Sequence, residues 1–286
     1  MQPSSQSIGV SDQRNYPIYL MGDVHGQLQI LISLLQKAYL IDEQAHWIGE
    51  QSHLWFLGDL VDRGPDSIGV LDLVMRLQRE AQLVGGAVES LLGNHEVLLL
   101  GASKFGKRLL GGGNHFLTRW RRNGGKKEDL GKLTPAHLTW IESLPAIARV
   151  EHALLIHADS SFYTRYGTSI AEVNTTLYNL LQHKDLLAWE DLWEHFASRG
   201  VFSHQLGGDE YVERFLSIFG GEQIIHGHTP IHLMVGGNVK SVTQPYSYAQ
   251  GRCLNLDGGI FLGGPGFLHQ ITAPAEAARK SENLPL

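Results

Sequence analysis

Six side chains that can bind a metal ion each follow a short apolar run in the sequence. They are Asp23, Asp59, Asn94, His157, His228 and Asp257. Four of them come directly after a glycine, which allows the backbone to turn tightly or to approach another group closely. Ligand sites of α/β proteins lie beyond the carboxyl ends of the strands. If the apolar runs are strands, the six donors meet at one edge and form a site for more than one metal ion.

Each of these residues alone has a simpler explanation. An Asp after a Gly is usually a turn residue or a helix N-cap. A single His in a strand is more often structural than a ligand. The prediction therefore depends on their joint occurrence, and for Asp257, which precedes Gly258 and Gly259, a turn and a place in the pocket are equal alternatives.

The elements that must position these side chains alternate between strands and helices in the first third of the chain. Strand character is found at residues 18–21 and 54–57, and a third strand ends at 90–92. Helical spacing of apolar residues predicts helices over 27–39 and 66–82. This order predicts an α/β fold.

The rest of the chain gives a weaker pattern. We expect helices over 134–143, 168–181 and 209–219, a hairpin of 146–150 with 153–156, and strands within 223–271. Residues 101–133, which are rich in Gly, Lys and Arg, predict a mobile loop with a solvated basic face around Trp120. We predict a single domain over 1–286, with an insertion at about 101–145 and a flexible tail at 273–286.

Five motifs in order resemble those of the phosphoprotein phosphatase family of metallophosphoesterases, within the calcineurin-like superfamily. They are GDVHG at 22–26, GDLVDRG at 58–64, GNHE at 93–96, LIHAD at 155–159 and HGHTP at 226–230. The last two are most similar to motifs of the bacterial and Shewanella-like branch. The resemblance implies a mixed αββα sandwich, in which two mixed β-sheets pack face to face between outer helices.

The resemblance also implies roles for individual residues. Asp23, His25 and Asp59 would bind the first of two divalent metal ions, and Asp59 would bridge to a second, bound by Asn94, His157 and His228. His226 lies in the same motif, but the family ligand matches the second histidine. The metals implied are two Mn²⁺, with Fe or Zn²⁺ as alternatives.

The catalytic residues implied are His95, Asp62, Arg63 and Arg199. His95 would be the general acid, Asp62 would orient it, and both arginines would bind phosphate. The implied reaction is hydrolysis of phosphate monoesters by direct attack of a metal-bridging hydroxide. The substrate would be a protein carrying phosphoserine, phosphothreonine or phosphotyrosine, or a small phosphoester. The eukaryotic enzymes have His-Gly-Gly where this chain has His157-Ala158-Asp159, which argues against a strict phosphoserine or phosphothreonine specificity.

Two other functions are open. Dinucleoside polyphosphate hydrolases resemble the chain in the same first three motifs but usually carry Asp in place of Glu96. A non-catalytic metal-binding or interaction protein is the third hypothesis, and the intact His95, Asp62 and both arginines argue against it.

Composition narrows the class of protein. A formal net charge of -6 argues against general nucleic-acid binding, so any positive potential must be local. Cys253 is the single cysteine, and it lies in an apolar strand where we expect it to be buried. One cysteine can form neither an internal disulfide nor a thiolate zinc cluster. Residues 1–16 lack the apolar core of a signal peptide, and no apolar run is long enough to span a membrane. We therefore expect a cytoplasmic protein.

Overall fold

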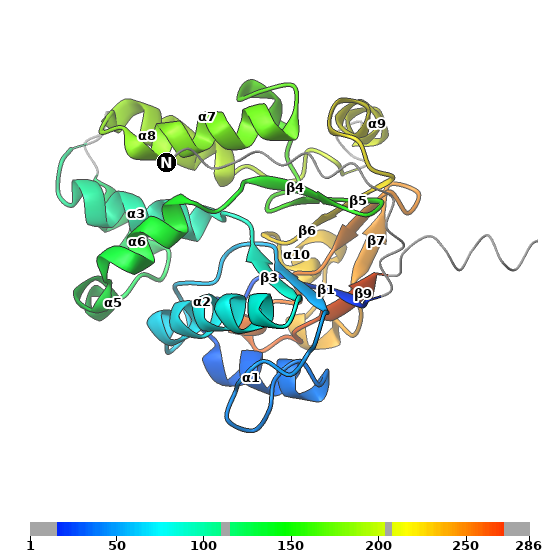
Figure 1. Ribbon diagram of the computed structural model, residues 1–286. Helices are drawn as coiled ribbons and strands as arrows, with labels where there is room; N and C mark the ends of the chain where they lie inside the picture. The colour runs from blue at the N-terminus through cyan, green and yellow to red at the C-terminus, as the bar shows by residue number, and fades with distance from the viewer. Residues whose placement is uncertain (1–15, 110–114, 204–207, 272–286) are drawn as a thin grey trace, which may run out of the picture.

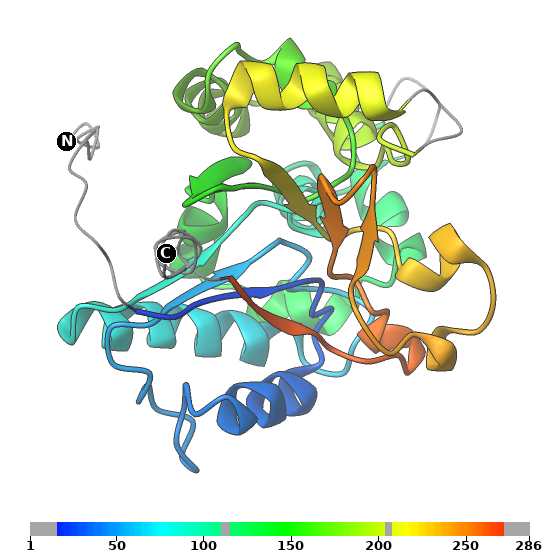
Figure 2. The same cartoon turned by 90° about the vertical axis from the view of Figure 1, so that its right-hand side faces the viewer.

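Two β-sheets pack face to face, and helices cover both outer surfaces (Figures 1 and 2). The computed structural model describes residues 16–109, 115–203 and 208–271. The tail expected at 273–286 lies outside the described residues. The mixed sandwich implied by the sequence motifs is confirmed.

The first sheet has the strand order β3-β2-β1-β9. Its strands are β1 (Ile18–Met21), β2 (His53–Phe56), β3 (Ala87–Ser90) and β9 (Leu268–Ile271). The first three are parallel, and β9 runs antiparallel beside β1. Helices α1 (Leu28–Lys37) and α2 (Ser67–Leu83) form the crossovers between the parallel strands and lie on the outer face of this sheet (Figure 1).

The second sheet has the strand order β4-β5-β6-β8-β7. Its strands are β4 (Ile147–Val150), β5 (Ala153–Ile156), β6 (Gln223–His226), β7 (Tyr246–Tyr248) and β8 (Cys253–Asn255). β5, β6 and β8 are parallel, and the edge strands β4 and β7 are antiparallel to their neighbours. The expected hairpin of β4 and β5 is confirmed, as is the burial of Cys253.

Alternating side chains of the strands form the core between the sheets. In β1, Ile18 and Leu20 point into this core, whereas Met21 packs on the side of the helices. In β5, Leu155 points inward and Leu154 outward, and both are fully buried. Burial on both faces explains why the parallel strands have nearly continuous apolar sequences.

Helices fill the segment that we expected to be a mobile loop, so that prediction was wrong for its described part. Residues 110–114 lie outside that part. The helices of this region are the end of α3 (Asn94–Phe105), α4 (Phe116–Arg122) and α5 (Lys127–Lys132). The next helix, α6 (Pro135–Glu142), confirms the helix expected over 134–143. Helix α4 packs against α3 and buries Phe116 and Trp120. Seven residues are too few to show a helical period in the sequence.

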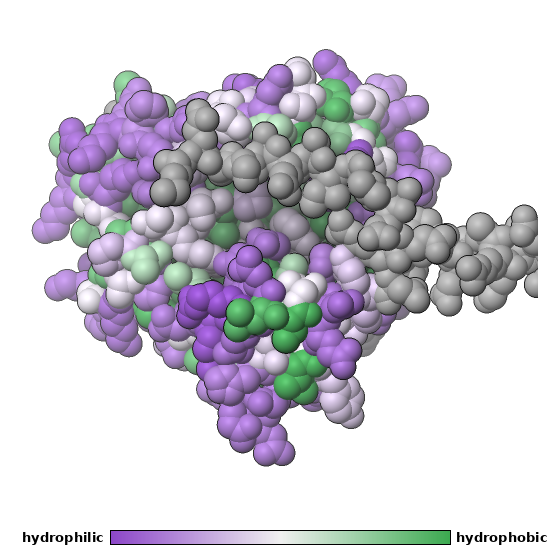
Figure 3. All heavy atoms as spheres, viewed as in Figure 1, coloured by the Kyte–Doolittle hydropathy of each residue, from purple (hydrophilic) through white to green (hydrophobic). Residues whose placement is uncertain are grey.

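The remaining helices lie mainly on the second sheet. They are α7 (Ile170–Gln182), α8 (Leu186–Phe196), α9 (Gly208–Phe219), the short α10 (Ile231–Val235), and the 3-10 turns η1 (Phe162–Arg165), η3 (Val239–Ser241) and η4 (Ile260–Leu262). The face seen in Figure 3 is mainly hydrophilic, with a small hydrophobic group below its centre. Among the described residues, no helix has the length and apolar character needed to cross a membrane.

Candidate active site

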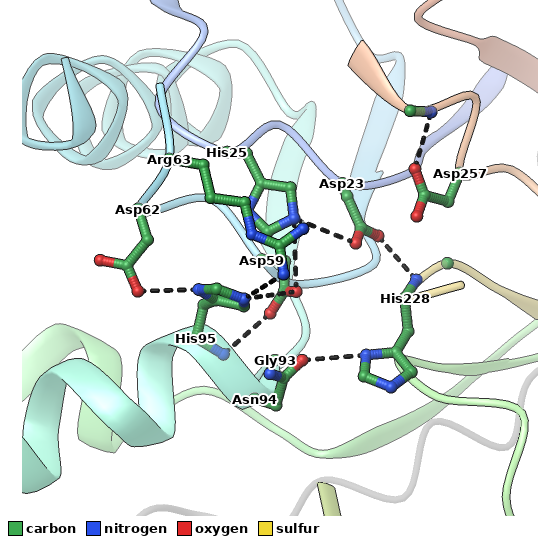
Figure 4. A network of polar contacts seen from close by, with 12 residues as sticks. Asp23, His25, Asp59, Asp62, Arg63, Gly93, Asn94, His95, His228 and Asp257 are labelled. Carbon is green, nitrogen blue, oxygen red and sulfur yellow. Dashed lines mark hydrogen bonds and ion pairs between the residues drawn. The ribbon is translucent and has the colours of Figure 1, made fainter. Parts of the chain in front are cut away.

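The carboxyl ends of strands from both sheets bring the six predicted metal-binding residues to one place. Asp23 follows β1, Asp59 follows β2, and Asn94 begins α3 after β3. His157 follows β5 and His228 follows β6 in the second sheet. Figure 4 shows Asp23 and Asn94 joined to His228 across the junction. All of these side chains are buried.

Close backbone approach explains two of the glycines in the motifs. A Cβ atom on Gly93 would lie 2.3 Å from Asp59 Oδ1, and one on Gly227 would lie 2.2 Å from Asp23 Oδ1. Any side chain at either position would displace a carboxylate of the site. The expectation that these glycines allow close approach is therefore confirmed by the geometry.

Five non-glycine residues of the motifs have a left-handed backbone conformation. They are His25, Asp59, Asp62, Arg63 and His228, with φ between 48° and 68°. Such residues cost free energy and persist where the surrounding structure fixes them, often at functional sites. Their concentration here marks the junction as a functional site.

His25 turns an unprotonated nitrogen toward two carboxylates. Its Nδ1 lies 3.0 Å from the carbonyl oxygen of Val61, which can only accept, so Nδ1 carries the proton. Its Nε2 lies 3.6 Å from Asp23 Oδ2 and 3.7 Å from Asp59 Oδ2. Asp23 Oδ2 is buried without a hydrogen-bond partner among the described residues. Two carboxyl groups and the lone pair of an imidazole therefore converge, which fits a cation.

His157 has the same arrangement on the other side of Asp59. Its Nδ1 donates to Leu57 O at 2.8 Å, which leaves Nε2 3.0 Å from Asn94 Oδ1 and 3.3 Å from Asp59 Oδ1. His228 Nδ1 lies 2.9 Å from the same Asn94 oxygen. Asp59 is thus shared by two donor groups, one through each carboxylate oxygen. A histidine that binds metal commonly donates its other N–H to a backbone carbonyl, as His25 and His157 do.

Burial shifts the pKa values of these groups toward their neutral forms. It raises the pKa of Asp23 well above the usual range, helped by the nearby charges of Asp257 and Asp59. Burial and the charge of Glu96 raise the pKa of Asp59 in the same way. Burial lowers the pKa of His25 well below its usual value and that of His157 to about 3. The histidines are therefore neutral and free to bind a cation, whose charge would in turn favour ionised carboxylates.

A second group of side chains lies beside the shared carboxylate. His95 Nδ1 lies 2.8 Å from Asp62 Oδ2, and its Nε2 lies 4.0 Å from Asp59 Oδ2. Arg63 Nη2 donates to His95 Nε2 at 2.9 Å. Since arginine only donates, His95 is neutral in this arrangement and its Nδ1–H points to Asp62. An acid–base group and an arginine are thus held at the edge of the metal-binding cluster.

Glu96 holds the loop after β2 in place. Its two carboxylate oxygens accept from the backbone N–H groups of Asp59, Leu60, Val61 and Gly93, at 2.8–3.3 Å. This one side chain fixes the backbone on both sides of Asp59 and at the start of α3. Its role explains why a glutamate belongs to the third motif.

Three further candidates from the sequence analysis lie outside the cluster of proposed metal ligands or at its edge. His226 points away from the cluster, because its Nε2 bonds to the Tyr248 hydroxyl at 2.8 Å. Asp257 lies beside Asp23, and its Oδ2 is buried without a partner among the described residues (Figure 4). Burial raises the pKa of Asp257 to about 6. Arg199 is exposed, and among the described residues no hydrogen bond joins it to the cluster. Its charge still helps to lower the pKa of His157, although burial has the larger effect.

Two aromatic residues at the site were not found from the sequence. Phe261 of η4 lies beneath the Arg63 guanidinium, whose Cζ is 4.1 Å from the ring centroid, and its edge meets the His25 ring. The indole Nε1–H of Trp120 donates to Asp62 Oδ1 at 2.7 Å. Phe261 lies four residues after Asp257, which is the only indication that the sequence offers.

Comparisons with known proteins give the same fold and family. The chain is 33% identical over 98 residues to Shewanella-like protein phosphatase 2 of Arabidopsis thaliana, covering 34% of this chain and 25% of that protein. It is 46% identical over 82 residues to the symmetrical bis(5'-nucleosyl)-tetraphosphatase of Pectobacterium carotovorum, covering 29% of this chain and 24% of that protein. The match thus spans about a quarter of the length of these relatives.

A solved structure has the same fold over most of this chain. The cold-active protein-tyrosine phosphatase of a psychrophilic Shewanella species matches 89% of this chain and 75% of its own, with a TM-score of 0.68 and 23% sequence identity. The family profile described as calcineurin-like phosphoesterase matches residues 16–232, which include every motif from GDVHG to HGHTP. The chain belongs to the calcineurin-like phosphoesterase family.

Proposed function

We propose that this protein is a metal-dependent phosphatase that hydrolyses phosphate monoesters. The observation that carries the proposal is the sharing of Asp59 between two groups of converging side chains of ligand type, directly beside His95 and Arg63. Asp23, His25 and Asp59 would bind one divalent cation, and Asp59, Asn94, His157 and His228 the other. Mn²⁺ is the metal that we propose, because it accepts carboxylate, amide and imidazole ligands together.

Charge explains how an acidic protein would bind phosphate. Two divalent cations bring four positive charges, and the proposed ligands Asp23 and Asp59 supply two negative ones. When bound, the cations would supply excess positive charge for a phosphate dianion and would lower the pKa of a water molecule. Arg63 would add a planar pair of donors for phosphate oxygens. Arg199, which is exposed, would contact the substrate from the rim.

His95 would deliver the proton that the leaving oxygen needs. Its Nε2 now accepts from Arg63 at 2.9 Å. A phosphate that drew the guanidinium away would free this nitrogen to hold a proton next to the ester oxygen. His95 would give that proton to the oxygen as its bond to phosphorus breaks, while water supplies the new oxygen on phosphate. Asp62 stabilises the charged imidazolium through Nδ1.

The first test is hydrolysis of 4-nitrophenyl phosphate by the full chain with added Mn²⁺. We expect turnover that is lost in Asp59→Asn, because a neutral amide would replace the carboxylate that both donor groups share. A useful control is Asp72→Asn, since Asp72 lies on α2, outside the five motifs, and contacts His137 at 2.9 Å. Equal activity of wild type and Asp59→Asn would refute the assignment.

A second candidate function is hydrolysis of dinucleoside polyphosphates. It is favoured by the similarity to the Pectobacterium relative, which is named for that activity. Wild-type protein should be assayed with diadenosine tetraphosphate and with peptides carrying phosphoserine, phosphothreonine or phosphotyrosine. Turnover of the dinucleotide with none of the peptides would replace the first proposal by the second. Binding of two metal ions without turnover of any phosphate ester would favour a non-catalytic role.

A further inference from the structure

Trp120 makes a buried polar contact with the proposed acid–base pair. Its side chain is 0% exposed, and its indole Nε1–H donates to Asp62 Oδ1 at 2.7 Å. The other oxygen of Asp62 receives His95 Nδ1 at 2.8 Å. Asp62 therefore lies between the indole and the imidazole, with one carboxylate oxygen fixed by each ring.

We propose that Trp120 is a positioning residue that controls proton delivery by His95 through the Asp62 carboxylate. The inference rests on the proposed phosphatase function. A carboxylate held at one oxygen can rotate, whereas one held at both oxygens fixes the direction of each lone pair. The indole N–H can only donate, so it fixes Asp62 Oδ1 as an acceptor and leaves Oδ2 facing His95 Nδ1.

The segment around Trp120 is built to hold this part of the second motif. Arg63 N donates to Gly124 O at 3.0 Å, and the Lys126 ammonium donates to the carbonyl of Gly64. Asp62 and Arg63 both have φ near 67°, a conformation that needs external contacts to persist. The Gly124 carbonyl and the Lys126 side chain, both after α4, supply such contacts next to the indole.

Gly125 allows the indole to occupy its position. A Cβ atom on Gly125 would lie 2.0 Å from Trp120 Cε2, so a side chain there would push the ring away. Gly125 N also bonds to Trp120 O at 3.0 Å, which closes the turn after α4. The turn, the indole and Asp62 thus form one packed unit.

Burial alone would give Trp120 a purely structural role, and the leaving group of the substrate separates the two roles. Phenolate is about as basic as the tyrosine side chain, with a pKa of about 10, and departs poorly without a proton. The 4-nitrophenolate anion is much less basic and departs without one. A residue that acts on proton delivery therefore affects phenyl phosphate more than 4-nitrophenyl phosphate, whereas damage to the fold affects both equally.

The test measures kcat and KM of the Mn²⁺-loaded full chain on both esters for wild type and Trp120→Phe. We expect kcat for phenyl phosphate to fall roughly tenfold and kcat for 4-nitrophenyl phosphate to fall by less than about twofold. KM should stay close to wild type for both. The matched control is Trp189→Phe, whose fully buried indole donates to the backbone oxygen of His183 at 3.0 Å and not to the site. Its ratio of the two kcat values should equal that of wild type.

A second variant separates the N–H group from the packing of the ring. β-(3-Benzothienyl)alanine at position 120 keeps the bicyclic shape and replaces only the N–H by sulfur. It should give the same selective loss as Trp120→Phe and remains informative if the phenylalanine variant does not fold. A wild-type ratio in the benzothienyl variant overturns the proposal, as does an equal loss on both esters. If wild-type protein hydrolyses neither ester, the phosphatase function fails, and this proposal fails with it.

Discussion

Glu96→Gln tests whether one buried carboxylate holds the loop that carries Asp59. Glu96 Oε2 accepts from the backbone N–H groups of Asp59 at 2.8 Å and Gly93 at 2.9 Å, and Oε1 accepts from Leu60 at 2.8 Å and Val61 at 3.3 Å. Glutamine keeps one acceptor oxygen and turns an NH₂ group toward the other pair of N–H groups. The least costly orientation loses the bonds at Oε1, of which the one to Val61 is long.

The expected magnitude follows from these bonds. A hydrogen bond to a charged group contributes about 1.5–3 kcal/mol, and one good and one weak bond together give roughly 3 kcal/mol. Burial raises the pKa of Glu96, so removal of its charge offsets part of this loss. We expect a net loss of about 2 kcal/mol, which lowers the Tm by roughly 4–8 °C for a domain of this size. Affinity for Mn²⁺ should fall roughly 10- to 100-fold, as for other residues that orient metal ligands.

Circular dichroism on the metal-free protein gives the Tm, and calorimetric titration with Mn²⁺ gives the affinity. Glu89→Gln is the matched control, because Glu89 is half-buried and accepts from Gln78 Nε2 at 3.2 Å. It should change stability by less than about 0.5 kcal/mol. A Tm and a Mn²⁺ affinity for Glu96→Gln equal to those of the control would refute the reasoning.

Three further predictions concern the metal ligands, Phe261 and Cys253. Burial raises the pKa of Asp23 and Asp59 in the folded, metal-free protein. The unfolded chain therefore loses these protons at a lower pH, about 4, than the folded protein does. The stability that the protonated carboxyls contribute is lost as the pH rises above this value. Mn²⁺ would stabilise the ionised carboxylates and would compete with protons for them. Differential scanning calorimetry should therefore give a larger Mn²⁺-induced rise in Tm at about pH 7.5 than at about pH 5. An equal rise would contradict the assignment of Asp23 and Asp59 as metal ligands. Phe261→Leu removes the ring whose centroid lies 4.1 Å from the Arg63 guanidinium, a contact that contributes about 0.5–2 kcal/mol. The KM for 4-nitrophenyl phosphate should therefore rise roughly 2- to 30-fold, with a smaller change in kcat. An unchanged KM would show that the ring does not hold Arg63 for substrate binding. Burial raises the pKa of the Cys253 thiol to about 12, so it should not react with a thiol reagent at about pH 8 until the protein unfolds, and rapid reaction of the native protein would contradict the burial.

The parts of the fold that sequence could predict are those with local patterns. The strand at Ile18–Met21 is a short apolar run, and the helix after Asp66 has a helical spacing of apolar residues. Asp66 caps α2 through Gly69 N as its residue type suggests. Helix α3 was missed because its residues 97–100 are all buried. A helix that is apolar on every side has no polar face, and its period disappears from the sequence.

Most of the residues proposed to bind metal could be picked out of the sequence because they follow strands, whose ends meet at one edge of the sheets. His25 was identified only through the resemblance of its motif. The contacts between distant segments could not be predicted. The bond from Trp120 to Asp62 joins residues 58 positions apart, with no pattern linking them. Trp120 was instead assigned to a solvated basic face, whereas packing of α4 on α3 buries it. Local composition gave no indication of this tertiary contact.

The bond from His228 N to Asp23 Oδ1 spans 205 residues, from the first sheet to the second. A cation bound by side chains of both sheets would cross-link residues that are far apart in the sequence. The single cysteine of the chain cannot form an internal disulfide that would do the same. Cross-links that close long loops lower the conformational entropy of the unfolded chain most. Removal of the metal would then have two effects. The proposed phosphatase activity would be lost, and the two sheets would separate more easily on heating or during proteolysis.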